Sequence, residues 1–149
     1  MLTQYHLPVS LCFLSTDLPI LTTVETAATL YHKDQDKYHL VFKADLSPGG
    51  SEQLIWLELS PYRVVMTLQT NNQLCYRHLW QQGIYGTSRY WLNQTDSGIE
   101  KSINLRNYTR NLSLDPHHLP RSLRLDYELW SPKVCLGHYI IHLDILYNC

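Results

Sequence analysis

The sequence predicts an all-β fold, a closed antiparallel β-barrel of about eight to ten strands with little helix. The first observation is strict alternation of apolar and polar residues: Leu123, Leu125, Tyr127 and Leu129 are separated by charged residues. This period of two is typical of a strand with one buried and one solvated face. The second is that turn residues recur at short intervals with no strand-helix-strand rhythm. Closure is favoured over an open sandwich because it removes exposed strand edges.

Each expected element follows from the same pattern. Between the segments lie turn residues, including an asparagine pair at 71–72 that suits positive φ. One segment, 73–82 ending at Gly83, could instead be a short helix with a glycine cap. The expected strands are 8–15, 22–32, 38–45, 53–60, 63–69, 73–79, 87–94, 99–112, 123–129 and 138–147.

Size and composition predict one domain over residues 1–149. The chain is 44% hydrophobic, enough for a core, and 17% charged, with a net charge of −1. A near-neutral chain has no overall field to attract nucleic acid or an anionic membrane. There is no apolar run long enough for a membrane span and no signal-peptide pattern, so we expect a cytoplasmic protein. The four scattered cysteines, Cys12, Cys75, Cys135 and Cys149, are expected to be free thiols.

Several local patterns, taken in order, resemble the YwiB-like family of small bacterial proteins of unknown function. They are a Gly-Gly loop at 49–50, the aromatic step Trp80-Gln-Gln-Gly83, Asp96-Ser-Gly98 before a long strand, and the strands 123–129 and 138–146. The resemblance covers most of the chain and implies a lipocalin-like (calycin) barrel. It supplies no catalytic residues. The Gly-x-Trp opening of true lipocalins is absent, so their ligand types are not carried over.

Histidine and cysteine fragments raise the question of a metal site. The candidates are His117-His118, His138 with His142, and Cys135-x-x-His138. Two histidines four residues apart on a strand lie about 13 Å from each other, too far for one ion. Because the sequence marks no third ligand, we predict no metal and no cofactor.

Catalytic signatures are also weak. The Gly-x-Ser-x-Gly elbow is missing, and the stretch from Gly86 to Tyr90 does not replace it. Asp126 and Glu128 share one strand face and could mimic a carboxylate pair, but a solvated outer face explains them equally well. We therefore expect a protein that is not an enzyme.

Aromatic and basic residues interleave in three segments and give the strongest candidate site. Rings that stack and cations that pair with anions suit a small ligand. Side chains two apart share a strand face, so each pair can point the same way. The opposing interpretation is that one set faces the core and the other faces water. The candidate ligand-binding residues are Tyr76, His78, Arg89, Trp91, Arg106, Tyr108 and Tyr127.

The sequence therefore favours a barrel that binds a small molecule in or at its mouth. One alternative is an interaction protein that docks a partner or a second copy, as in a homodimer. Another is an enzyme of undefined reaction that uses His78, Arg89 or Tyr127. Nucleic acid and membrane are not expected as partners.

Overall fold

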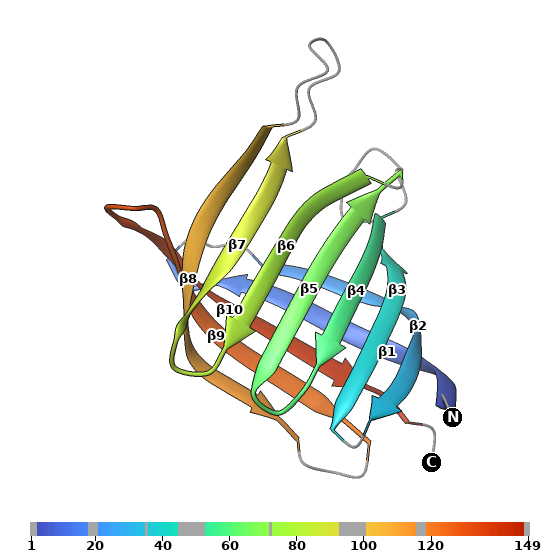
Figure 1. Ribbon diagram of the computed structural model, residues 1–149. Helices are drawn as coiled ribbons and strands as arrows, with labels where there is room; N and C mark the ends of the chain where they lie inside the picture. The colour runs from blue at the N-terminus through green and yellow to red at the C-terminus, as the bar shows by residue number, and fades with distance from the viewer. Residues whose placement is uncertain are drawn as a thin grey trace.

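Ten antiparallel strands close into a barrel in which each strand lies beside its neighbours in the chain (Figure 1). The computed structural model describes residues 3–17, 21–34, 36–44, 53–71, 73–92, 101–115 and 119–147. The first and last strands pair with each other, from Val9 opposite Ile145 to Ser15 opposite Tyr139, and this pairing closes the barrel. The predicted all-β closed barrel is confirmed, and the described residues contain no helix.

The strands match the ten predicted segments, with shifts at their ends. The alternative helix over 73–82 is wrong, because this segment is a strand. The strands are β1 (Thr3–Ser15), β2 (Leu21–Asp34), β3 (Lys37–Ala44), β4 (Gln53–Leu59), β5 (Arg63–Thr70), β6 (Gln73–Gln81), β7 (Tyr85–Leu92), β8 (Lys101–Leu114), β9 (Ser122–Trp130) and β10 (Cys135–Ile145).

One predicted boundary differs for a physical reason. Strand β1 begins before Pro8, because this proline lies beside the end of β10 and needs no ladder N–H there; its carbonyl accepts from the Leu146 N–H at 2.9 Å. The turn between β5 and β6 was predicted correctly, with Asn71 at a φ of 53°. The expected loop over 46–52, residues 116–118 of the expected loop over 115–120, and the 93–100 segment with Asp96-Ser-Gly98 lie outside the described residues.

The centre of the barrel is packed with aliphatic side chains that point inward at every second position. Leu11, Leu30, Leu40, Ile55 and Leu143 are each fully buried. An apolar residue buried to this extent contributes roughly 1.5–3 kcal/mol relative to exposure. Apart from Ser15 on β1, the buried polar side chains of the described residues gather on one side of this packed centre, on β6 to β8.

Two further observations concern the rest of the chain. The three described cysteines, Cys12, Cys75 and Cys135, are unpaired thiols, whereas Cys149 lies outside the described residues. No helix of the described segments is long and apolar enough to cross a membrane.

Candidate ligand site inside the barrel

A buried imidazole is the centre of the polar part of the interior. His78 points inward from β6 and is only 5% exposed. It lies opposite Ser88 of β7, which is fully buried. Asn107 of β8 faces the same space and is also fully buried. Serine and asparagine are uncommon at fully buried positions unless they are hydrogen-bonded.

These three side chains form a chain of hydrogen bonds. The Asn107 Nδ2 donates to Ser88 Oγ at 2.8 Å, and Ser88 Oγ lies 2.7 Å from His78 Nδ1. Because Ser88 Oγ already accepts from the amide, its own proton is free to go to the imidazole. This assignment makes Nδ1 an acceptor and leaves the His78 N–H on Nε2, as a donor inside the barrel.

A glycine makes this arrangement sterically feasible. The Asn107 Nδ2 also reaches the Leu79 carbonyl on β6 at 3.1 Å, passing beside Gly86 of β7. A Cβ at Gly86 would lie 2.0 Å from Leu79 O and 3.0 Å from Asn107 Oδ1. Any larger residue would therefore collide with the backbone of β6, which explains why glycine occupies this position.

Burial determines the charge of the imidazole. Desolvation lowers the pKa of His78 from 6.5 to about 3, because the protein interior solvates the charged form poorly. His78 is therefore neutral at physiological pH. The five fully or nearly fully buried polar side chains of the described residues are Ser15, His78, Ser88, Asn107 and Thr109, so none of them is an acid, a lysine or an arginine.

Aromatic rings surround His78. The Trp80 ring stacks on the imidazole with centroids 4.8 Å apart, and Tyr90 meets it edge-on at 5.4 Å. The Tyr76 ring lies 4.9 Å away and the Tyr127 ring 6.2 Å away. Strands β6, β7 and β9 thus present rings to one imidazole, which makes a mainly apolar wall with polar tips.

Four tyrosines bring their hydroxyls close enough to interact electrostatically. Burial, aided by Tyr139, raises the pKa of Tyr90 to about 12. Burial also raises the pKa of Tyr76 and Tyr127, with smaller contributions from neighbouring phenols. All four rings, including Tyr139, which stacks on Tyr127 at 5.5 Å, face the interior. The three shifted hydroxyls remain protonated and can donate hydrogen bonds.

Three further polar atoms in this region are buried without a hydrogen-bond partner among the described residues. They are Trp80 Nε1, Asn107 Oδ1 and Thr109 Oγ1. A buried polar group without a partner costs about 1–3 kcal/mol. Such groups in a folded protein call for an explanation. One explanation is that they form hydrogen bonds with a bound polar molecule.

The wall beside this cluster extends past the neighbouring strands. The upper ends of β7 and β8 rise together beyond β6 (Figure 1). Tyr90 lies opposite Ile103, so Ile103 is on the barrel-facing side, as is Leu92 two residues from Tyr90. These two apolar side chains are 46% and 44% exposed. They form an exposed apolar surface next to Tyr90.

The structure separates the seven residues nominated by the sequence. Tyr76, His78 and Tyr127 lie together inside the barrel. The other four lie on the outer face of β7 and β8, where the Arg89 guanidinium covers the Trp91 ring at 4.9 Å. Arg106 covers the outer Tyr85 ring at 5.3 Å, and that ring packs against Tyr108 at 5.0 Å. The seven residues therefore do not form one cluster.

Sequence reasoning missed Ser88, Tyr90, Asn107 and Tyr139. Ser88 and Asn107 resemble surface residues by type, and only the strand register places them opposite buried partners. The signal was present for Tyr90, because it lies one residue from Arg89 and must take the opposite face. The nominated pairs shared a face as expected, but the sequence did not show which face was inside.

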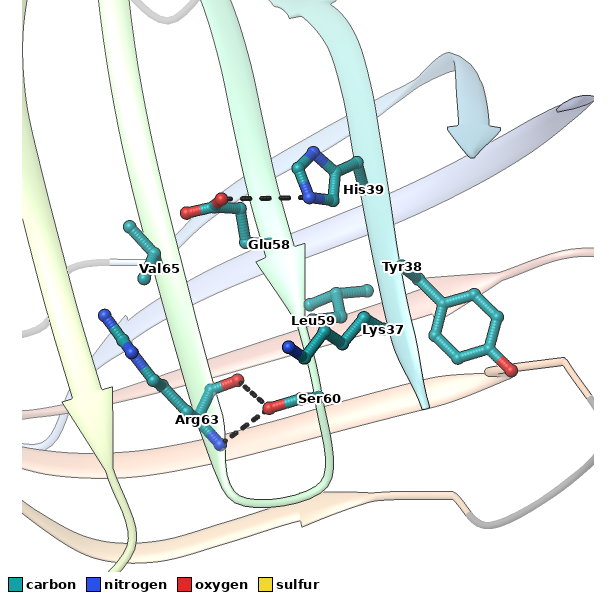
Figure 2. A pocket seen from close by; sticks show the side chains of 8 residues that line it. All are labelled: Lys37, Tyr38, His39, Glu58, Leu59, Ser60, Arg63 and Val65. Atoms are coloured by element: carbon teal, nitrogen blue, oxygen red, sulfur yellow. Dashed lines mark hydrogen bonds and ion pairs between the residues drawn. The ribbon is translucent and has the colours of Figure 1, made fainter. Parts of the chain in front are cut away.

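A hollow lies on the outside of the barrel, over β3, β4 and β5 (Figure 2). It has a volume of about 190 Å³. Its polar groups largely satisfy one another: His39 Nε2 lies 3.7 Å from Glu58 Oε1, and Ser60 Oγ accepts from the Arg63 N–H at 3.1 Å. Trp56 Nε1 also donates to His39 Nδ1 at 3.0 Å. This hollow is a weaker candidate than the interior.

Comparison with known proteins supports the fold and gives no activity. No protein-family model matches the chain, and no curated protein matches it. The crystal structure of the ywiB protein from Bacillus subtilis superimposes with a TM-score of 0.59 over 98% of this chain and 94% of that one, at 14% sequence identity. The expected resemblance thus holds for the fold: this chain is a closed β-barrel whose fold is similar to that of the ywiB protein.

Proposed function

We propose that the protein binds a small, uncharged, largely apolar molecule inside the barrel, beside His78, in the manner of a lipocalin-like barrel. The single observation that carries the proposal is a neutral imidazole, surrounded by aromatic rings, in an interior where the described residues bury no acid, lysine or arginine. Ligand pockets are mostly apolar walls with a few convergent polar groups. Up-and-down barrels hold such ligands at one open end.

The polar groups define what the molecule must offer. The Nε2–H of His78, the indole N–H of Trp80 and the hydroxyls of Tyr76 and Tyr90 are all donors. A ligand that presents a carbonyl or ether oxygen matches them. A charged ligand would lose its hydration without meeting an opposite charge, which is costly.

Catalysis fits this geometry poorly. Ser88 donating to His78 resembles a nucleophile with its base, at 2.7 Å. However, an imidazole whose pKa is about 3 is a weak base at neutral pH. Ser88 is also fully buried. Binding therefore accounts for the cluster better than a reaction does.

A thermal-shift screen tests the proposal, because a ligand that binds the folded state raises its apparent stability. The probes are uncharged aromatic ketones and esters, with acids and amines of matched size for comparison. Neutral probes should raise the melting temperature and the charged ones should not. For a hit, Tyr76→Phe and Tyr90→Phe should weaken binding about 2- to 10-fold, the effect of losing one hydrogen bond.

The matched control is Tyr85→Phe, since Tyr85 lies on the outer face and is 54% exposed. It should bind the hit as the wild type does. Equal weakening by Tyr85→Phe and Tyr76→Phe, or hits confined to charged molecules, would contradict an interior site.

A second candidate function is docking of an acidic partner on the outer face of β6 to β8. Arg77 and Arg89 lie directly opposite each other on β6 and β7, and like charges in this position repel. Arg106 lies on the same outer face as Trp91 and Tyr108. Glu58 Oε2 lies 3.9 Å from Arg77 Nη2, and a bound carboxylate beside Arg89 would relieve the repulsion further. Arg89→Ala and Arg106→Ala should weaken partner binding and its salt dependence with little change in stability.

A further inference from the structure

The outer face of the β9–β10 hairpin brings together a carboxylate, a thiol and an imidazole. Glu128 of β9 lies directly opposite His138 of β10. Their neighbours Tyr127 and Tyr139 point inward, so these two side chains point outward. Cys135 is on the same hairpin, and the three donor atoms all lie within 4.8 Å of one another. This group is separate from the interior site.

An irregularity in the hairpin puts the thiol in place. Cys135 lies opposite Trp130 and Gly137 lies opposite Leu129, so Leu136 is an extra residue in a β-bulge. Without the bulge, Leu136 would occupy the position opposite Trp130 and the thiol would be one residue further from Glu128. Bulges commonly re-aim side chains at functional positions.

We propose that Glu128, Cys135 and His138 bind a zinc ion, with a water molecule as the fourth ligand. The distance from His138 Nε2 to Glu128 Oε2 is 3.7 Å. Two donor atoms held about 2.1 Å from a tetrahedral ion lie about 3.4 Å apart, so a small adjustment suffices. One sulfur, one nitrogen and one oxygen are donors that zinc accepts, and three protein ligands leave a position open.

Neighbouring groups orient the ligands as outer partners do in known zinc sites. Asp17 Oδ2 lies 3.5 Å from His138 Nδ1 and accepts the His138 backbone N–H at 2.8 Å. A proton on Nδ1 that faces this carboxylate leaves Nε2 free for the metal. Trp130 Nε1 donates to Glu128 Oε1 at 2.9 Å, so the other carboxylate oxygen faces the histidine.

One cation competes for the carboxylate. Arg110 Nε lies 3.7 Å from Glu128 Oε2, but its side chain is 55% exposed. An ion pair exposed to this degree is worth little, and the guanidinium can turn into solvent when the metal binds. Arg110→Gln should therefore bind zinc at least as tightly as the wild type.

The sequence marked Cys135-x-x-His138 but supplied no third ligand. Glu128 comes from the facing strand, and only the hairpin register shows that it lies opposite His138. His142, four residues further along β10, pairs instead with Asp144 at 3.1 Å.

Cobalt substitution tests the proposal directly. One equivalent of Co²⁺ added to the reduced, metal-free protein should give a thiolate-to-cobalt charge-transfer band and tetrahedral d–d bands, which one equivalent of Zn²⁺ abolishes. Cys135→Ser and His138→Gln should each lose the bands and weaken binding more than about 100-fold, exceeding the effect of an outer partner. Asp17→Asn should keep the bands but weaken affinity about 10- to 100-fold.

Two matched controls complete the experiment. Cys12→Ser removes another thiol and His142→Gln another outer histidine of the same strand, and both should bind Co²⁺ as the wild type does. Circular dichroism establishes that each variant is folded, with Cys135→Ala as a second variant if Cys135→Ser is not. Absence of the bands in wild-type protein, their survival without Cys135, or their loss in Cys12→Ser would overturn the assignment.

Discussion

The buried imidazole of His78 should make the barrel lose stability as the solution is acidified. The pKa of His78 is about 3 in the folded protein, below its ordinary 6.5, because burial disfavours the charged form. Between these two pH values the unfolded chain takes up a proton that the folded chain does not. The contribution of neutral His78 to the free energy of unfolding is therefore fully present above about pH 6.5, and it is lost as the pH drops toward about 3.

The size of the effect follows from this difference. Stability falls by about 1.4 kcal/mol for each pH unit below the unfolded pKa, so acidification from about pH 7.5 to 4.5 costs about 3 kcal/mol. A domain is stable by only about 5–15 kcal/mol, so this loss is readily measured. His78→Gln removes the titrating group and should remove this part of the pH dependence.

Urea unfolding at a series of pH values, followed by tryptophan fluorescence, measures the effect. His78→Gln will lose some stability at every pH because the stacking on Trp80 is lost, but its slope against pH should be shallower than in the wild type. His142→Gln, which replaces a half-exposed histidine in the same way, is the matched control. Equal slopes in wild type and His78→Gln, or an NMR signal of His78 that titrates above about pH 4.5, would refute the reasoning.

Three further substitutions test the local geometry. Gly86→Ala places a methyl group 2.0 Å from Leu79 O, so thermal unfolding should show a loss of about 1–3 kcal/mol or more, and an unchanged melting temperature would contradict this. Ser88→Ala removes the donor to His78 Nδ1, and chemical denaturation should show a loss of about 1–3 kcal/mol; a neutral result would mean that the hydrogen bond is absent. Asn71→Ala should cost about 1–2 kcal/mol because Asn71 has a φ of 53°, whereas Asn71→Gly should not, and equal losses would refute a left-handed turn.

The strands could be predicted because the sequence alternates where one face is buried. In β9 the inward positions Leu123 and Leu125 are fully or almost fully buried while Arg124 between them is exposed. The turn at Asn71 could also be predicted from the local sequence, because asparagine suits a positive φ. Boundaries were less predictable, as at Pro8, because the missing N–H matters only where a neighbouring strand needs it.

The candidate site was only partly predictable. An alternation with a period of two shows which side chains share a face of a strand, but not which face points into the barrel. In β7 both faces carry aromatic and polar residues: Arg89 and Trp91 on one, Ser88 and Tyr90 on the other. Their pairing with β6 decides the matter, since Ser88 lies opposite the buried His78. The proximity of Glu128 and Cys135 could not be predicted either, because a β-bulge sets the relative position of the two residues. Long-range register is what the sequence did not reveal.

The pairing of β1 with β10 has a consequence for how the barrel folds. Nine of the ten strand pairs join chain neighbours, but this one joins residues more than 120 positions apart, from Ser15 opposite Tyr139 to Val9 opposite Ile145. Closing a loop of that length costs roughly 4 kcal/mol of chain entropy. Until it closes, β1 and β10 each present an unpaired edge that can join another chain. A circular permutant that links residues 3 and 147 by a short loop and opens at Asn71 would turn this contact into a local hairpin. It would also make β5 and β6 the terminal strands, so the unpaired edges before closure, and with them the site of association during refolding, should move to these two strands.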